Sequence, residues 1–77
     1  MAKLVFLGRL ADIAGRSELD VAPGSLEAVL AALDPALALA LLDERVRMAL
    51  NGELIGERGL VLAAGDELAF LPPVSGG

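Results

Sequence analysis

The feature that most constrains the fold is one apolar stripe near the middle of the chain. Four side chains recur at the spacing i, i+3, i+4 and i+7, which places them on one face of an α-helix: Leu26, Val29, Leu30 and Leu33. Ser25 is well placed as the N-cap, and Glu27 lies in the first turn, where a negative charge favours the helix dipole. This one-sided helix needs a second element to cover its apolar face.

Two segments before the helix read as strands. Lys3–Gly8 is a short run rich in strand-forming residues, and Ser17–Ala22 alternates, with Leu19 and Val21 on one face. The loop between them has room for one helical turn at Leu10–Ala14. The pair therefore predicts a hairpin that precedes the helix.

A second, shorter helix follows. Asp34 is placed as its cap and Pro35 as its first residue, and the segment through residue 44 is rich in alanine and leucine. Its Ala/Leu alternation has the period of a strand, but both residues favour helices. A short helix is the prediction.

The remaining segments predict three strands. Val46, Met48 and Leu50 share one face, the Asn51–Gly52 pair is a strong two-residue hairpin signal, and the return strand is Glu53–Ile55. The last strand follows a turn at Gly65–Asp66, and the prolines at positions 72 and 73 end it, since neither continues an interior ladder. This strand is Glu67–Leu71.

This order of elements predicts an α+β roll: a mixed sheet with one main helix and a short second helix. We expect a single domain over residues 1–77, with residues 72–77 as a flexible C-terminal tail. The helical stripe should pack on sheet residues that include Val5, Leu19, Val21 and Phe70.

Composition excludes several classes of function. Six basic and eleven acidic residues give a net charge of −5 without a basic patch, which argues against nucleic-acid binding. Uncharged runs such as Ala28–Leu33 and Pro35–Leu42 are too short to span a membrane, and the N-terminus does not read as a signal peptide. We therefore expect a cytoplasmic protein that is not a membrane partner.

Side-chain catalysis is not expected either. The chain has no histidine and no cysteine, so the usual general base and thiol nucleophile are missing. The carboxylate pairs Asp43–Glu44 and Asp66–Glu67 read as solvated surface, and without histidine or cysteine they make a poor metal site. We expect no catalytic side chain, no metal and no bound cofactor.

The reactive group that remains is the C-terminal carboxylate after Gly76–Gly77. A Gly-Gly end has no Cβ atoms, so it can extend and thread a narrow channel of another enzyme, while Pro72 and Pro73 stiffen its base. A free carboxylate is inert to acyl transfer, but an acyl-adenylate is a good electrophile that sulfur can attack. The plain alternative is a frayed terminus that happens to end in glycine.

Three stretches together resemble the family of small, sulfur-carrier subunits of molybdopterin synthase. They are "GDELAFLPPVSGG" at Gly65–Gly77, "LNGE" at Leu50–Glu53 and "VFLGRLADIAG" at Val5–Gly15. The resemblance covers nearly the whole chain, and its "PPVSGG" end is the most specific part. It implies the ubiquitin-like β-grasp fold and a sulfur carrier in molybdenum cofactor biosynthesis that is no enzyme on its own.

The resemblance also implies partners and residue roles. An E1-like adenylyltransferase would use ATP to adenylate Gly77, and a persulfide-derived sulfur would convert it to a thiocarboxylate. The tail would then enter the large subunit of the synthase and give its sulfur to the pterin precursor. Gly77 is the sulfur-bearing residue and Gly76 its flexible neighbour. The stretch that matches the docking segment is Phe70, Leu71, Pro72, Pro73, Val74 and Ser75.

Four other interpretations stay open. The sulfur carrier of thiamine biosynthesis has a similar fold and a Gly-Gly end, but its family lacks the double proline seen in "FLPPVSGG". A ubiquitin-like modifier that conjugates to lysines is not excluded. Ser25 faintly resembles a phosphopantetheine site, although Gly24 stands where acyl carrier proteins have aspartate, and a plain N-cap is favoured. A stand-alone interaction domain would keep its function after the tail is trimmed.

Overall fold

A computed structural model describes residues 1–56 and 59–73. Its three helices are α1 (Arg9–Ala14), α2 (Leu26–Ala31) and α3 (Pro35–Leu41). Its strands are β1 (Ala2–Phe6), β2 (Glu18–Val21), β3 (Gly24–Ser25), β4 (Arg47–Leu50), β5 (Glu53–Ile55), β6 (Val61–Leu62) and β7 (Glu67–Leu71). Of these three helices, none is long and apolar enough to cross a membrane.

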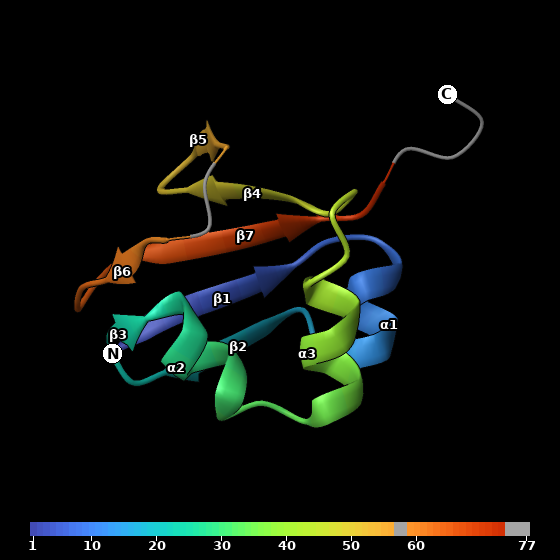
Figure 1. Cartoon of the computed structure of the whole chain (residues 1–77), viewed down its shortest axis with the longest axis horizontal. Coiled ribbons are helices and arrows are strands. Elements are labelled where there is room, and N and C mark those ends of the chain that lie inside the picture. The colour runs from blue at the N-terminus through green and yellow to red at the C-terminus, as the bar shows by residue number, and fades with distance from the viewer. Residues whose placement is uncertain (57–58, 74–77) are drawn as a thin grey trace.

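The main sheet has the strand order β2-β1-β7-β4-β5. The β1 and β7 strands are parallel, and the other neighbours are antiparallel, so the sheet is mixed as predicted. The last strand of the chain therefore lies in the middle of the sheet (Figure 1). A separate pair, β3 with β6, was not predicted because each strand has only two residues.

Both predicted helix caps are confirmed. The Ser25 hydroxyl accepts a hydrogen bond from the Ala28 backbone N–H at 3.1 Å, and the Asp34 carboxylate accepts from the N–H groups of Ala36 and Leu37 at 3.1 and 3.3 Å. Pro35 is the first residue of α3, as expected. These bonds satisfy N–H groups that a helix leaves unpaired at its start.

The prediction of one main helix is wrong in one respect, because the three helices are nearly equal in length. The α2 helix ends at Ala31, although its stripe was expected to reach Leu33. Asp34, which precedes Pro35, has an extended backbone. A proline ring clashes with a helical conformation of the residue before it, so α2 cannot continue through Asp34. Residues 32–34 therefore connect α2 to α3, and Leu33 is only half-buried.

The core lies between one face of the sheet and the helices. Leu26, Val29 and Leu30 of α2 are buried in it, and Leu19 and Val21 pack against it while partly exposed. The expectation that Val5 belongs to the core is wrong. On β1 the buried positions alternate and include Leu4 and Phe6, so Val5 points to the opposite face.

Two turns are fastened together at the start of β7. Asn51 and Gly52 both have positive φ, at 50° and 88°, as a type I′ hairpin turn requires. The Asn51 side-chain amide donates to Asp66 Oδ1 at 3.1 Å, and its Oδ1 accepts from the Glu67 N–H at 2.9 Å. Asp66 Oδ2 accepts from the Ala63 N–H at 2.8 Å. These bonds to Ala63 and Asn51 lower the pKa of the Asp66 carboxyl.

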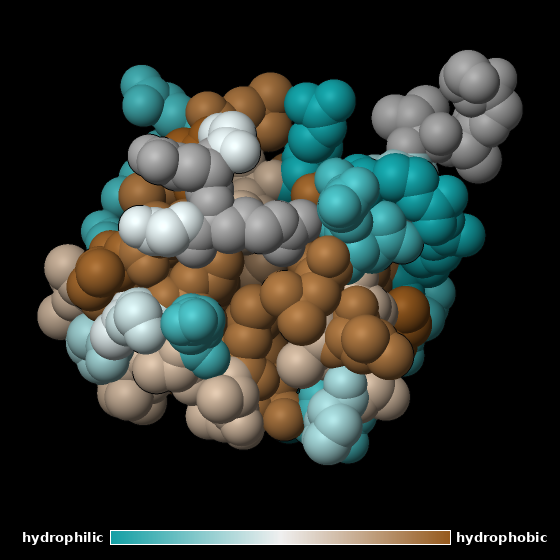
Figure 2. Space-filling view, in the orientation of Figure 1, coloured by the Kyte–Doolittle hydropathy of each residue, from teal (hydrophilic) through white to brown (hydrophobic). Residues whose placement is uncertain are grey.

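The side of the molecule that carries the helices is partly apolar. Leu39 and Leu42 are 74% and 51% exposed, and Figure 2 shows a band of hydrophobic surface over α3 and toward α2. This band reflects the Ala/Leu-rich composition of the segment.

Candidate functional site

The sheet has a second face, which the helices leave open. The ladder register places Val5 opposite Ala69, Ala69 opposite Ala49, and Ala49 opposite Leu54. Residues that lie directly opposite one another point to the same face, and these alternate with the buried positions. A row of small and medium apolar side chains therefore crosses the open face from β1 to β5.

Consecutive residues at the end of β7 point to opposite faces. Phe70 is fully buried and stacks on Phe6, with ring centroids 6.0 Å apart. Leu71 is half-buried and lies opposite Arg47 on the open side of the ladder. The expected partner-binding stretch is thus divided: Phe70 cannot contact a partner directly in this fold, and its role is to hold β7 against the core.

The base of the tail is fixed by a close approach between Pro72 and Gly8. A Cβ atom added to Gly8 would lie 3.0 Å from Pro72 Cγ, tighter than ordinary van der Waals contact. Gly8 also has φ 55° and ψ −136°, a conformation that favours glycine. The Leu7 N–H donates to the Phe70 carbonyl at 3.1 Å, so the same short segment holds the end of β7.

A groove opens beside this base. It has a volume of about 620 Å³. Its apolar lining is formed by Leu54, Leu71, Pro72 and Pro73, and its polar lining by Glu44, Arg45 and Arg47. The groove therefore joins the edge of the open face to the point where the chain leaves the sheet.

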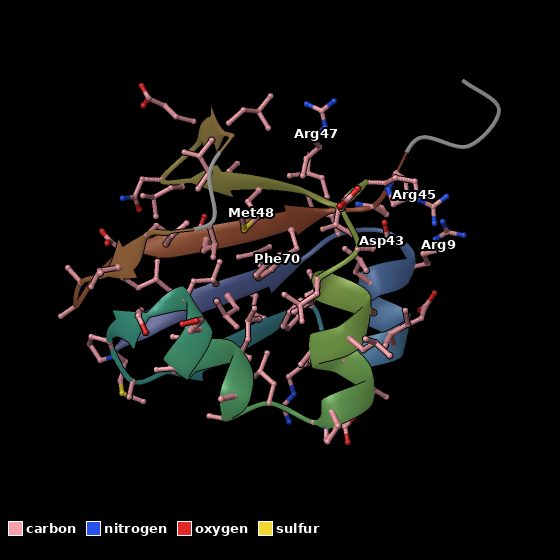
Figure 3. The ribbon with its side chains drawn as sticks, in the orientation of Figure 1. Arg9, Asp43, Arg45, Arg47, Met48 and Phe70 are labelled. Carbon is pink, nitrogen blue, oxygen red and sulfur yellow. The ribbon has the colours of Figure 1, made fainter. Side chains whose placement is uncertain are left out.

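The two arginines of the groove differ in their surroundings. Arg45 forms a two-pronged contact with Asp43, with Nη2–Oδ2 at 2.9 Å and Nε–Oδ1 at 3.2 Å. The hydrogen bond and charge of Asp43 raise the pKa of Arg45. Arg47 has no ion-pair partner among the described residues, and Figure 3 shows its side chain directed away from α2 and α3.

The structure describes some of the predicted site residues but not all of them. Leu71, Pro72 and Pro73 come together at the groove, whereas Val74, Ser75, Gly76 and Gly77 lie outside the described residues. In the described part of the chain, no cluster of three or more acidic side chains could hold a metal ion.

Sequence reasoning missed Gly8, Arg45, Arg47 and Leu54. The alternation that put Val46, Met48 and Leu50 on one face also put the two arginines on the other, so a signal for them was present. The sequence alone does not show the register of β4 against β7, which places Arg47 opposite Leu71.

The family of the chain follows from its match to a family model. The model of the ThiS family matches residues 4–77, which is nearly all of the sequence. The chain belongs to the ThiS family.

A curated relative of this ThiS-family chain is the molybdopterin synthase sulfur carrier subunit of Emericella nidulans. The two are 42% identical over 55 residues, which cover 71% of this chain and 56% of that protein. The matched part therefore spans little more than half the length of the relative. This similarity agrees with the family resemblance seen in the sequence.

Two solved structures are similar over almost the whole chain. SAMP1 from Haloferax volcanii is 32% identical with a TM-score of 0.73, covering 99% of this chain and 98% of that one. A complex of subunits 1 and 2 of the molybdopterin-converting factor from Helicobacter pylori contains a chain that is 25% identical, with a TM-score of 0.65 and coverage of 99% and 97%. The ThiS-family chain has the ubiquitin-like β-grasp fold, as predicted.

Proposed function

We propose that this chain is a sulfur carrier for molybdopterin synthase, and that the carboxylate of Gly77 is the group that carries the sulfur. The observation that carries the proposal is the 42% identity to a molybdopterin synthase sulfur carrier subunit. The family match, which runs through residue 77, supports the same assignment. The protein acts as the substrate of one enzyme and the donor subunit of another.

The chemistry needs two activation steps and one transfer. The Gly77 carboxylate attacks the α-phosphate of ATP on an E1-like adenylyltransferase, releasing pyrophosphate and leaving an acyl-adenylate. A persulfide displaces AMP, and a thiol then reduces the resulting acyl disulfide to the thiocarboxylate. The large subunit of the synthase transfers this sulfur to the pterin precursor, and water restores the carboxylate. Because the cycle uses ATP, we place it in the cytoplasm.

The fold suits this use of the tail. Residues after Leu71 leave the central strand of the sheet, and the contact of Pro72 with Gly8 fixes where they start. A defined starting point matters because a misplacement of about 1 Å at the reacting atom costs on the order of a hundredfold in rate. Gly76 and Ser75 then provide reach for Gly77, and Leu71, Pro72, Pro73 and Val74 contact the partner.

The open face supplies the second half of the interface. Its row of Val5, Ala49, Ala69 and Leu54 is apolar, and Leu54 is 68% exposed. Contiguous exposed apolar surface on a small domain is typical of a protein-binding site. We assign this face to the large subunit, in keeping with a similar chain that is solved as one of two subunits of a molybdopterin-converting factor.

The test is intact-mass spectrometry after incubation with the activating enzyme, ATP and a persulfide donor. We expect one oxygen of the C-terminal carboxylate to be replaced by sulfur. Deleting Gly77 retracts the carboxylate by about 3.3–3.6 Å, and adding one alanine moves it outward by as much. Both variants should melt like the parent and lose adenylation. If they are adenylated and support molybdopterin formation as well as the parent, the proposal is wrong.

A second candidate function is a ubiquitin-like modifier. The observation that favours it is the similarity to SAMP1, described elsewhere as a small archaeal modifier protein, over 98% of that chain. Both functions begin with adenylation, so their products distinguish them. A modifier forms an amide between Gly77 and a lysine of another protein, whereas the sulfur carrier yields a thiocarboxylate. The thiamine-pathway carrier yields the same thiocarboxylate and is distinguished by its partner.

A further inference from the structure

Two apolar hollows on the helical side of the molecule share the exposed side chain of Glu27. The first has a volume of about 260 Å³, lies between α2 and α3, and is lined by Glu27, Leu30, Ala31, Ala38 and Leu42. The second has a volume of about 390 Å³, lies between α2 and β6, and is lined by Ser25, Leu26, Glu27, Gly59, Leu60 and Val61. The two hollows therefore form one surface with a carboxylate at its centre, which we call the helical face.

Apolar side chains project around these hollows. Leu39 and Leu42 are 74% and 51% exposed, and Val61 is 70% exposed. The band of hydrophobic surface over α3 and toward α2 continues this patch (Figure 2). Exposed apolar groups gathered around hollows are typical of a surface that another protein covers.

The charge of this part of the chain has a single sign. Residues 17–44, which form β2, β3, α2 and α3, contain six acidic residues and no basic residue. This segment therefore carries a charge of −6, and the rest of the chain carries +1, which together give the net charge of −5. An occupant of the helical face meets a surface whose own segment supplies no cation.

The acidic residues beside the hollows keep their charge uncompensated. Glu27 and the exposed Asp34, at the start of α3, have no ion-pair partner within residues 1–56 and 59–73. Arg45 is engaged by Asp43, and Figure 3 shows it together with Arg9 near the end of α3, away from α2. No neighbouring cation is thus placed to cancel the charge at the centre of the helical face in the described part of the chain.

This charge selects the kind of occupant. An anionic bilayer and a nucleic acid are both negatively charged, so the helical face repels them. A second copy that used the same face would place one acidic surface against another, which like-charge repulsion disfavours. A basic protein surface is attracted by the same charges and can also cover the exposed leucines.

We propose that the helical face docks a basic amphipathic segment of a partner protein. A lysine or arginine of this segment pairs with Glu27, and apolar residues on either side of it enter the two hollows. The inference goes beyond the proposed function, because the helical face lies on the side of the sheet opposite to the open face. The chain can therefore hold this partner while its tail and open face engage the large subunit.

The probe is a synthetic helical peptide of about 14 residues, with leucines on one face and lysines on the other. Its matched control carries glutamate in place of every lysine. NMR titration of the full-length chain measures binding at about 0.05 M and about 0.5 M salt. We expect the lysine peptide to shift the amide signals of α2, α3 and β6 and to spare those of β4 and β5. The glutamate peptide should bind at least about tenfold more weakly at low salt.

A charge reversal tests the role of Glu27. Glu27→Lys should weaken binding of the lysine peptide about tenfold at low salt and much less at high salt. Glu53→Lys is the matched control, because it makes the same change in net charge at an exposed position on β5, at the edge of the sheet far from α2 (Figure 1). It should stay within about threefold of the parent. Equal weakening by the two variants would show a general attraction to an acidic protein and overturn the inference.

An uncharged change tests the hollow between α2 and α3. Leu42→Gln should weaken binding about threefold to fivefold at both salt concentrations, because it removes an apolar wall and leaves the charge unchanged. Ile13→Gln is the matched control, since Ile13 on α1 is 49% exposed, close to the 51% of Leu42, and lines neither hollow. It should stay within about twofold of the parent. Equal effects of the two changes would contradict the placement of the peptide.

Other results assign the helical face differently. If the lysine peptide does not bind, binds no better than the glutamate peptide, or shifts mainly the signals of the open face, the inference is wrong. Analytical ultracentrifugation of the chain alone tests self-association. A concentration-dependent dimer that Leu42→Gln dissociates would assign the face to a second copy and overturn the proposal. The adenylation of Gly77 is measured independently of all these experiments, so the proposed function stands or fails separately.

Discussion

Phe70 and Leu71 are neighbours in the chain, but they lie on opposite faces of the same strand. Phe70 is fully buried and stacks on Phe6, while Leu71 borders a groove that is open to solvent. Both were expected to form one partner-binding stretch. The difference shows that a single strand holds the domain together with one set of side chains and presents a surface with the next.

The two faces also differ in the size of their side chains. The covered face carries leucine, phenylalanine and methionine, including Leu4, Leu68 and Met48. The open face carries Ala49 and Ala69 at its centre. Large side chains fill the space under the helices, whereas small ones leave a flat surface that a second protein can approach closely.

Truncating Phe70 should have the largest effect on stability. Phe70→Ala removes a fully buried ring and its stacking contact with Phe6, and should lower the free energy of unfolding by about 3–5 kcal/mol. Leu71→Ala, one residue along on the open face, should lower it by less than about 1.5 kcal/mol, because this side chain is already partly in solvent. Urea denaturation measures both. Equal losses would erase the proposed difference between the faces.

Gly8→Ala should come next, at about 2–3 kcal/mol. The added Cβ meets Pro72 Cγ at 3.0 Å, and the positive φ adds backbone strain. Gly15→Ala is the matched control: its φ is 77°, but no atom lies within 4 Å of the added Cβ, so about 1 kcal/mol is expected. Pro72→Ala in the Gly8→Ala background should restore part of the loss. No recovery in thermal melts would mean that Pro72 does not contact Gly8.

A smaller effect should depend on pH. The hydrogen bonds from Ala63 and Asn51 lower the pKa of Asp66 in the folded state, so the folded chain binds this proton less readily than the unfolded chain. The stabilisation is therefore complete at neutral pH and is lost as the pH falls through the lowered pKa of the carboxyl. Asp66→Asn should reduce the difference between melting temperatures at pH 7 and pH 3. Asp20→Asn, an exposed change of equal charge on β2, should reduce it less.

Leu71→Glu should cause the smallest loss of stability. Its effect on binding should exceed its effect on stability by the widest margin. The change should cost less than about 1 kcal/mol of folding free energy, because the carboxylate can reach solvent from a half-buried position. It should weaken the complex with the large subunit at least about tenfold, since it places a charge in an apolar contact. A melting temperature that falls sharply while binding persists would assign Leu71 to the core.

Much of the fold could be predicted because local signals agreed with it. Ser25 and Asp34 cap helices, and the Asn51–Gly52 turn joins β4 to β5 as expected. The face of β1 could not be predicted, because residues 4–7 are all apolar and show no alternation. Its inward face is decided by parallel pairing with β7, a contact between the two ends of the sequence.

The sequence singled out three residues that line the groove, but not the residues around them. Leu71, Pro72 and Pro73 stood out from the resemblance, and all three line the groove. Gly8 and Pro72 are 64 positions apart, so only the closed sheet reveals that one must be small for the other to fit. The place of Arg47 beside Leu71 likewise follows from the register of β4 against β7, which the sequence does not show.

The central position of β7 has a mechanical consequence. A hydrogen-bonded ladder flanks this strand on each side, parallel with β1 and antiparallel with β4. If a partner draws in the residues beyond Leu71, as the proposed function requires, the pull runs along the strand. Such a force loads many bonds of both ladders at once in shear, instead of opening them one after another as it would at an edge strand. The two ladders should therefore resist such a pull better than a single ladder at an edge strand would.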